Sequence, residues 1–191
     1  GVDHVSIHHT NEIAQSECAT GQEFVRFWIH HEFLGVDGEK MSKSTGNIYT
    51  VRDLQEKGFN PLAFRYLTFQ THYRAEMNFT WESLTAAQTA LDKIYEIAAD
   101  FDEVHKDSDI EYERDFYDAL NLDLNMPKAL ASIFTLIKTI NKIKISKKDA
   151  QQTIKLLEGF DKVLGIINKK ERSKISDEIR KLIQEREKAR K

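Results

Sequence analysis

The stretch 38–47 holds the residues best suited to chemistry, because two lysines, Lys40 and Lys43, lie three positions apart among hydroxyl side chains and glycines. A lysine ammonium is a point charge on a flexible stem, which lets it follow a phosphate group as that group moves. Serine hydroxyls and glycine-flanked backbone N–H groups can add hydrogen bonds to the same phosphate. The composition predicts a cationic, phosphate-binding loop, and a solvated polar loop is the alternative.

A second candidate is the pair His8 and Glu12, which lie four positions apart. In a helix this spacing places both side chains on one face, one turn apart. An imidazole and a carboxylate so placed can bind zinc, or they can form a simple hydrogen bond on the helix surface. The residue types alone leave both interpretations open.

Length and composition are those of an ordinary globular protein: 191 residues, 40% apolar and 31% charged, enough for one large domain or two small ones. No apolar run approaches the roughly 18 residues that a membrane helix needs, so no membrane partner is expected. The single cysteine, Cys18, excludes an internal disulfide framework and fits a reducing, cytoplasmic location.

Charge is unevenly spread along the chain. Residues 141–191 hold 16 Lys/Arg against 8 Asp/Glu, whereas the rest holds 12 against 23. A basic segment of this kind can contact a polyanion, and a lysine-covered helix face in water is the alternative. The basic side chains that could make such contacts are Lys142, Lys144, Lys147, Lys148, Lys169, Lys170, Arg172 and Lys174.

The elements that must position His8 and Glu12 are predicted as strand, helix, strand. Residues 2–7 and 24–30 contain β-branched and aromatic side chains, which indicates strands. Residues 11–18 between them have a helical pattern that ends near Gly21. This order predicts a βαβ unit with a parallel sheet. Because such a sheet rarely stands as two strands, we expect that an N-terminal half is missing.

Helices are predicted after the 38–47 stretch. Thr50 begins one with a capping-box pattern, and Gly58 ends it. Asn60 and Pro61 suit the N-cap and N1 positions of the next. Beyond position 80 apolar residues repeat at helical spacing, which predicts a bundle of four or five helices. These helices are expected over 80–106 and from about 116, 126, 146 and 176.

The letters at 40–44, Lys-Met-Ser-Lys-Ser, match the KMSKS signature of class I aminoacyl-tRNA synthetases. Segments 1–3 and 8–17 closely resemble the sequence that distinguishes cysteinyl-tRNA synthetases within that class. One departure is Thr10, where the family usually has a glutamate that is not a ligand. Further segments resemble the same family in its order, so that the resemblance covers essentially the whole chain; they are 28–30, 37–44, 71–74 and 123–130.

The resemblance implies a reaction in which cysteine and ATP form cysteinyl-adenylate and the cysteine is then transferred to tRNA(Cys). Lys40 and Lys43 would be the catalytic residues and would bind the triphosphate of ATP, which enters with Mg²⁺. Lys43 in particular would stabilise negative charge as pyrophosphate leaves. Ser42 and Ser44 would add contacts to ATP, and Asp3 would contact the ribose or the adenylate.

The resemblance also implies an active-site zinc that binds the thiolate of the substrate, with His8 and Glu12 matching two of its four protein ligands. Zinc prefers sulfur to a hydroxyl oxygen, so the metal would reject serine. The other two ligands are cysteines that this sequence lacks, and Cys18 is not expected to replace them. We therefore expect that the chain alone neither holds zinc tightly nor forms adenylate.

The implied fold is mainly α: a remnant βαβ of a Rossmann-type catalytic domain, a connecting region and an antiparallel α-helical bundle. The expected boundaries are 1–48 for the catalytic part with the KMSKS loop, 49–79 for the connecting, stem-contact region and 80–191 for the helical tRNA-binding bundle. The family's first half, with its His-Ile-Gly-His signature, and its small C-terminal domain have no counterpart in this sequence. A monomer that works with that missing half is expected.

Two other functions remain open. One is a stand-alone helical module that binds tRNA or protein, and the other is the cysteine ligase of mycothiol synthesis, which shares the zinc helix. The segment 123–130 and the basic C-terminal end favour the synthetase. The affinity of the chain for ATP and tRNA distinguishes the helical module from an enzyme fragment.

Overall fold

The computed structural model describes residues 1–42, 44, 46–100, 111–142 and 147–167, and most of them are helical, which confirms the mainly α class. Two short helical turns, η1 (Val2–His4) and η2 (Val5–His9), run directly into helix α1 (Thr10–Thr20). The strands are β1 (Leu34–Val36), β2 (Glu39–Lys40) and β3 (Met77–Phe79). The other helices are α2 (Val51–Glu56), α3 (Pro61–Phe69), α4 (Trp81–Asp100), α5 (Glu111–Asn121), α6 (Met126–Lys142) and α7 (Lys147–Leu164).

The two strands predicted at the N-terminus are wrong. Residues 2–9 are helical, and residues 21–33 form no strand. A strand is stable only when a neighbouring strand takes up its backbone hydrogen bonds, and no described residue pairs with either stretch in that way. The predicted helix between them is confirmed: α1 ends at Gly21, whose φ is 65°, and in the other direction it continues into η2.

The sheet that forms has the order β2-β1-β3. β1 and β2 make an antiparallel hairpin whose turn residues, Asp37 and Gly38, have φ angles of 53° and 80°, as a type I′ turn requires. β1 and β3 run parallel, with Gly35 opposite Asn78. The chain between β1 and β3 contains residues 38–47, α2 and α3, so the sheet fixes where that stretch begins.

The helix starts predicted after residues 38–47 are confirmed. Thr50 Oγ1 accepts a hydrogen bond from Asp53 N, and the Asp53 carboxylate accepts one from Thr50 N at 2.6 Å, which completes a capping box before α2. Asn60 Oδ1 accepts from Leu62 N at 2.9 Å, ahead of Pro61 at the start of α3. These caps join residues within one turn, so local sequence suffices to predict them.

Of the bundle helices, α4 after Thr80 and α6 at Met126 begin where they are predicted, whereas α5 begins at Glu111, before the predicted start at about 116. Ser83 N donates to Thr80 Oγ1 at 3.0 Å, the N-cap bond expected of that threonine. The helix predicted from about 146 is confirmed, since α7 begins at Lys147. The predicted end of the fourth helix at 106 and the last helix predicted from 176 lie outside the described residues.

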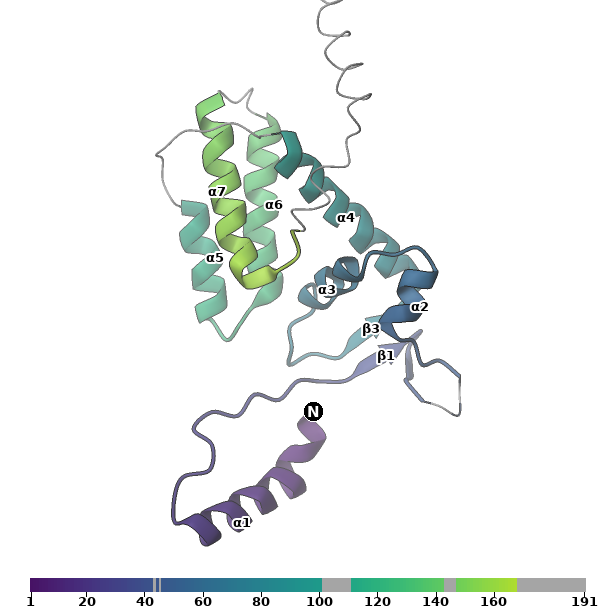
Figure 1. Ribbon diagram of the computed structural model, residues 1–191, viewed down its shortest axis with the longest axis vertical. Coiled ribbons are helices and arrows are strands. Elements are labelled where there is room, and N and C mark those ends of the chain that lie inside the picture. The colour runs from purple at the N-terminus through teal and green to yellow at the C-terminus, as the bar shows by residue number, and fades with distance from the viewer. Residues whose placement is uncertain (43, 45, 101–110, 143–146, 168–191) are drawn as a thin grey trace, which may run out of the picture.

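One hydrophobic core joins the sheet to α2, α3, α4 and the bundle helices α5, α6 and α7 (Figure 1). Its fully buried side chains include Tyr66, Leu91, Phe116 and Phe160. The rings of Phe116 in α5 and Phe160 in α7 stack with their centroids 4.3 Å apart. α3 packs along α4, and α5 packs along α6. The sheet lies next to α3 and the beginning of α4 (Figure 1).

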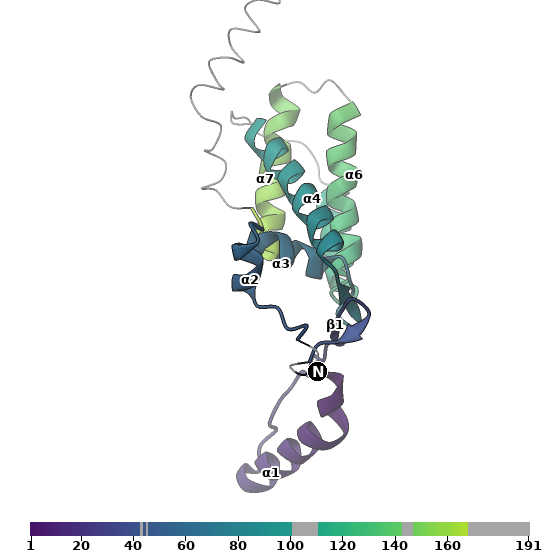
Figure 2. The same cartoon turned by 90° about the vertical axis from the view of Figure 1, so that its right-hand side faces the viewer.

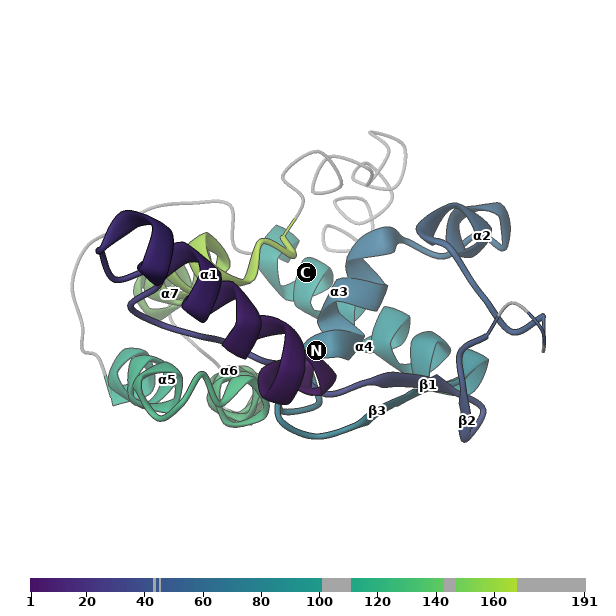
Figure 3. The same cartoon turned by 90° about the horizontal axis from the view of Figure 1, so that it is seen from below.

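Helix α1 and the segment that follows it lie apart from this core (Figures 1 and 2). No residue of α1 is buried. Seen from below, β2 lies towards one end of the molecule and α5 and α7 lie at the opposite end (Figure 3). None of the helices that the structure describes is long and apolar enough to span a bilayer.

Candidate active site

Both ends of the lysine loop (residues 38–47) are anchored on the aromatic part of the core. Met41, inside the loop, is half-buried and packs against this core. Tyr49, just beyond the loop, lies against Trp81 and Phe79, with ring centroids 5.0 and 5.9 Å away. Met41 and Tyr49 also line one small cavity of about 50 Å³. The two ends are therefore held at the same place in the fold.

Asn47 closes the neck of the lysine loop. Its Oδ1 accepts a hydrogen bond from Ser42 N at 2.8 Å, and its Nδ2 donates to Lys40 O at 3.2 Å. One side-chain amide thus satisfies a donor and an acceptor on the opposite side of the loop, as a paired strand would. The backbone of Lys40 is fixed by this contact, while its side chain is exposed.

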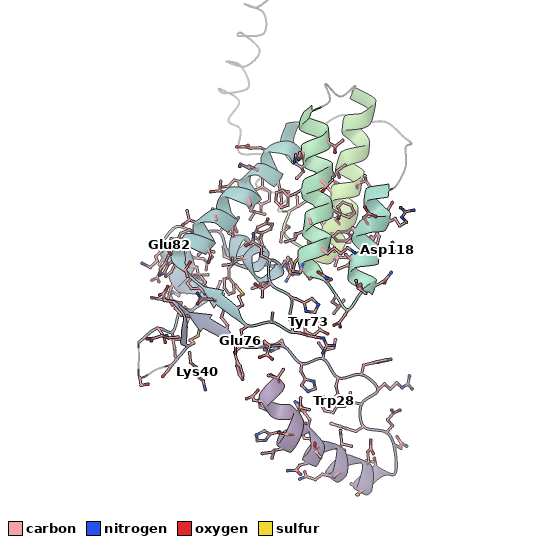
Figure 4. All side chains as sticks on the ribbon, turned by 180° about the vertical axis from the view of Figure 1, so that it is seen from behind. Trp28, Lys40, Tyr73, Glu76, Glu82 and Asp118 are labelled. Atoms are coloured by element: carbon pink, nitrogen blue, oxygen red, sulfur yellow. The ribbon has the colours of Figure 1, made fainter. Side chains whose placement is uncertain are left out.

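Lys40 lies beside an open cavity of about 570 Å³. The three strands and their flanks line it, through residues 33–35, 38–41 and 76–78. Figure 4 shows Lys40 and Glu76 at this sheet, with the Lys40 side chain directed away from the helical bundle. An exposed ammonium at the edge of a cavity can meet the phosphates of a bound ligand as a mobile point charge.

The hydroxyls predicted to contact ATP lie next to each other. The Oγ atoms of Ser42 and Ser44 are 2.6 Å apart, and Ser44 N donates to Ser42 Oγ at 3.1 Å. Lys43, predicted as the second catalytic lysine, lies outside the described residues.

Glu12 contacts His9 rather than His8. Glu12 Oε2 lies 3.0 Å from His9 Nδ1, whereas the exposed His8 ring lies against that of His4, with centroids 4.9 Å apart. The reason is the π-helical turn η2, in which hydrogen bonds join residues five apart. The four-residue spacing that brings side chains together in an α-helix therefore does not bring His8 onto Glu12.

The donor set around α1 is incomplete for zinc. Within the described ranges, no three His, Cys, Asp or Glu side chains lie close enough together to hold a metal ion, and Cys18 is exposed. Structural zinc sites use four protein ligands, and catalytic sites use three and an open position. The residues described here do not by themselves form a zinc site.

Trp28 and His30, in the second predicted strand, pack against the start of α1. The His9 ring lies 4.4 Å from the Trp28 ring and 5.0 Å from the His30 ring, measured between centroids. His30 Nε2 is buried and has no hydrogen-bond partner among the described residues. Desolvation and the neighbouring His9 lower the pKa of His30, so the ring is neutral near pH 7. A buried, unpaired ring nitrogen is a place where a ligand atom or water could bind.

Asp3 lies in η1 with its carboxylate half-exposed, 3.6 Å from His4 Nε2. Val2 N donates to His31 O at 3.2 Å, which attaches η1 to the segment that leads into β1. Asp3 thus belongs to the N-terminal segment. Within the described residues, no hydrogen bond or ion pair joins Asp3 to Lys40, so the structure leaves the two predicted ATP contacts unconnected.

Asn47 and His9 have contacts that the sequence prediction of the site did not include. The signal for Asn47 was its place after Gly46, since Gly-Asn is a common turn pair. For His9 the signal was the adjacent pair of histidines before Glu12. Such a pair offers the carboxylate one partner at i−3 and another at i−4.

Two family models match this chain. The model described as tRNA synthetases class I (C) catalytic domain matches residues 1–89, and a DALR domain model matches residues 115–168. The first match contains α1, the lysine loop and the strands β1, β2 and β3, and the second contains most of α5 and the helices α6 and α7.

The chain is similar to curated cysteine–tRNA ligases along nearly its whole length. It is 39% identical over 207 residues to that of Brachyspira hyodysenteriae, covering 97% of this chain and 43% of the relative. It is 42% identical over 209 residues to that of Leptospira interrogans, covering 100% of this chain and 44% of the relative. The chain thus spans a little under half the length of these curated relatives.

A solved structure supports the fold. The chain superposes with a TM-score of 0.58 and 20% identity on LeuRS of Agrobacterium radiobacter K84 in a ternary complex with tRNA and LeuAMS. The match covers 87% of this chain and 25% of the LeuRS chain. The matched catalytic and DALR domains and the ligase relatives place the chain in the cysteinyl-tRNA synthetase family of class I aminoacyl-tRNA synthetases.

Proposed function

We propose that this chain provides the lysine loop, two zinc ligands and the helical bundle of an enzyme that activates cysteine with ATP and transfers it to tRNA(Cys). The observation that supports this proposal best is the lysine loop itself. Its neck is closed by Asn47, and Lys40 projects from it beside a cavity of about 570 Å³.

Lys40 and Lys43 act on the triphosphate of ATP, which carries Mg²⁺. As pyrophosphate leaves, negative charge gathers on its oxygens, and ammonium groups placed there stabilise the transition state more than the ground state. Ser42 and Ser44 donate hydrogen bonds to the same phosphates, and Asp3 accepts from the ribose. No side chain needs to form a covalent bond with the substrate in this scheme.

His8 and Glu12 contribute two of the four zinc ligands, and residues outside this chain complete the set. The metal, when bound, selects a thiolate over a hydroxyl. Within this chain His9 holds Glu12 through a 3.0 Å contact, so the carboxylate is already oriented by a neighbouring imidazole.

The missing half of the parent enzyme covers the N-terminal segment. Phe27 is 85% exposed, Ile29 68% and Ile7 62%, far more than isolated apolar side chains need to be. They lie in the two stretches that the sequence predicts as strands. Surfaces contributed by the other half would cover these side chains and remove them from water.

We propose the division 1–48, 49–79 and 80–191 for the catalytic part, the connecting region and the tRNA-binding bundle. The chain acts in the cytoplasm and as a monomer together with the missing half. The basic side chains proposed to contact tRNA, from Lys142 to Lys174, lie where the structure describes no side chains, so they are assigned from charge alone.

Pyrophosphate exchange tests this proposal. The longer polypeptide that contains this chain exchanges pyrophosphate with ATP in the presence of cysteine, and the chain alone does not. Lys40→Ala lowers the rate about 10²–10³-fold, the usual effect of losing a transition-state donor. Lys93→Ala, an exposed lysine of α4, leaves the rate unchanged. Activity of the isolated chain above background, or an unaffected Lys40→Ala variant, contradicts the proposal.

A metal measurement tests the zinc assignment separately. After dialysis the chain alone retains much less than one zinc per molecule, whereas the longer polypeptide retains about one. Stoichiometric zinc in the isolated chain contradicts the assignment of only two ligands to it.

A further inference from the structure

Two family-like segments to which no role has been assigned, 71–74 and 123–130, meet in the structure. Arg74 forms a bidentate ion pair with Asp123, in which Nε donates to Oδ2 at 2.6 Å and Nη2 donates to Oδ1 at 3.1 Å. Tyr73 Oη donates to Asp123 Oδ1 at 2.5 Å, and the Arg74 guanidinium lies over the Tyr73 ring. Figure 4 shows Tyr73 close to the turn between α5 and α6 that carries Asp123.

His72 completes the contact through both ring nitrogens. Its Nε2 lies 3.1 Å from Asp123 O, a carbonyl that can only accept, and its Nδ1 accepts from Arg74 N at 3.3 Å. The tautomer with its hydrogen on Nε2 fits both bonds. Three consecutive residues thus hold one residue of the bundle, and we call His72, Tyr73, Arg74 and Asp123 the clamp.

The turn that the clamp holds has a strained backbone. Asp123 and Leu124 have φ angles of 54° and 52°, in the left-handed region that is unfavourable for a branched side chain such as leucine. Leu124 is also 45% exposed, so burial of its side chain contributes little to offset this cost. Strain of this kind persists only where surrounding contacts impose it, and it is typical of functional positions.

The other side of the clamp residues is attached to the N-terminal segment. Tyr73 O accepts from Glu32 N at 2.8 Å, and Met77 N donates to Phe33 O at 3.0 Å, directly before β1 and β3 pair. Residues 72–77 are therefore bonded to the bundle on one side and to residues 32–33 on the other. Residues 32–33 continue into the β1–β2 hairpin that ends at Lys40.

We propose that Tyr73, Arg74 and Asp123 are positioning residues that couple the placement of the helical bundle to residues 32–33, and so to the part of the chain matched by the catalytic-domain model. The clamp is one of the connections between the part of the chain matched by the catalytic-domain model and the part matched by the DALR model, beside the bond from Arg65 Nε to Leu164 O and the shared hydrophobic core. It goes beyond the proposed function, since it concerns how two parts of the chain are held together and not which reaction they perform.

Backbone amide exchange of the full chain tests this coupling at a distance. Asp123→Asn is the key variant, because asparagine keeps the shape of the side chain and tolerates a left-handed backbone, so that the charge and one acceptor oxygen of the clamp are removed. Glu32 N–H does not contact Asp123 and is bonded to it only through Tyr73. It is expected to exchange about tenfold faster in this variant, which is within the range for residues that share one hydrogen-bond network. Arg74→Lys keeps the charge but cannot form the bidentate contact, so it is also expected to speed the exchange of Glu32 N–H.

The matched control is Glu56→Gln. It breaks the exposed Arg52–Glu56 pair, which lies within α2 and spans no two elements. This variant is expected to leave the exchange of Glu32 unchanged. Faster exchange confined to residues 122–125 makes the clamp a local feature and overturns the coupling. Equal acceleration at Glu32 and at Leu91, deep in the core, reports global unfolding and also overturns it.

A second measurement uses the longer polypeptide and rests on the proposed function. There Asp123→Asn is expected to lower the rate of cysteine transfer to tRNA about tenfold, while pyrophosphate exchange changes by less than about twofold. Equal effects on both steps overturn the coupling. Absence of exchange activity in the unmodified polypeptide overturns the proposed function alone, because the amide-exchange result does not depend on catalysis.

Discussion

The first 33 residues and the helical part from Pro61 onward contain similar side chains and yet have different structures. Both are rich in aromatic and branched apolar residues. In the helical part Tyr66, Phe116 and Phe160 are almost fully buried, whereas in the N-terminal part Phe27 is 85% exposed and α1 contains no buried residue. Apolar composition therefore does not make a core by itself. A second surface must be present to cover it.

The two parts are also stabilised in different ways. The helical part holds its helices by contacts between elements, so its free energy of unfolding is shared over the whole core. The N-terminal part holds its shape by α1 itself and by a few hydrogen bonds such as Glu32 N to Tyr73 O. The two parts are therefore expected to respond differently to substitution and to protease.

Phe→Ala substitution in the two parts gives the largest expected difference. Phe160→Ala removes a ring that stacks on Phe116 in the core and is expected to lower the free energy of unfolding by about 3–5 kcal/mol. Phe27→Ala removes an exposed ring and is expected to change it by less than about 0.5 kcal/mol. Urea unfolding followed by circular dichroism measures both. Similar losses for the two variants would mean that Phe27 is packed in solution.

The rate of trypsin cleavage can be compared between the two parts at two exposed arginines. Arg26 lies in the stretch 21–33, which forms no helix or strand, whereas Arg65 lies on α3, where its Nε donates to Leu164 O. Cleavage after Arg26 is expected to be at least about a hundredfold faster, because cleavage after Arg65 requires α3 to open first. Mass spectrometry of timed digests measures the two rates, and comparable rates would contradict the contrast.

The capping box of α2 offers a smaller, local test. Thr50→Ala removes the hydroxyl that caps Asp53 N and is expected to lower stability by about 1 kcal/mol. Thr50→Ser keeps the hydroxyl and is the control, with little expected loss. Helix α1 has no side-chain cap at His9, so it offers no equivalent bond to remove. An unaffected Thr50→Ala variant would show that α2 is held by packing alone.

Acid titration of Asp123 gives the smallest expected effect. Hydrogen bonds from Arg74 and Tyr73 lower the pKa of Asp123 to about 2 from an ordinary 3.8. Because the pKa is lower in the folded protein, the stabilisation from the clamp is complete above about pH 4 and is lost as the pH falls through 2. Carboxyl carbon NMR is expected to show this midpoint, and Arg74→Lys is expected to move it upward. A midpoint near 3.8 would mean that the clamp is open in solution.

The lysine loop, α1 and the helix starts at Thr50, Asn60 and Thr80 were predictable from the sequence. A cap or a turn is made within one helical turn, so the residues that form it are neighbours in the chain. The Asp37–Gly38 hairpin carried an equally local signal, although the strands were expected elsewhere.

The remainder depended on partners far away in the chain. Residues 2–7 and 24–30 have the composition of strands, but a strand needs a neighbour, and β1 finds its parallel neighbour in β3, more than forty positions later. The turn η2 determines that Glu12 contacts His9, and the bundle brings Asp123 to Arg74 from 49 positions away. Hydrogen bonds and ion pairs between distant residues form only once packing has placed the backbones, so only the tertiary structure could decide them.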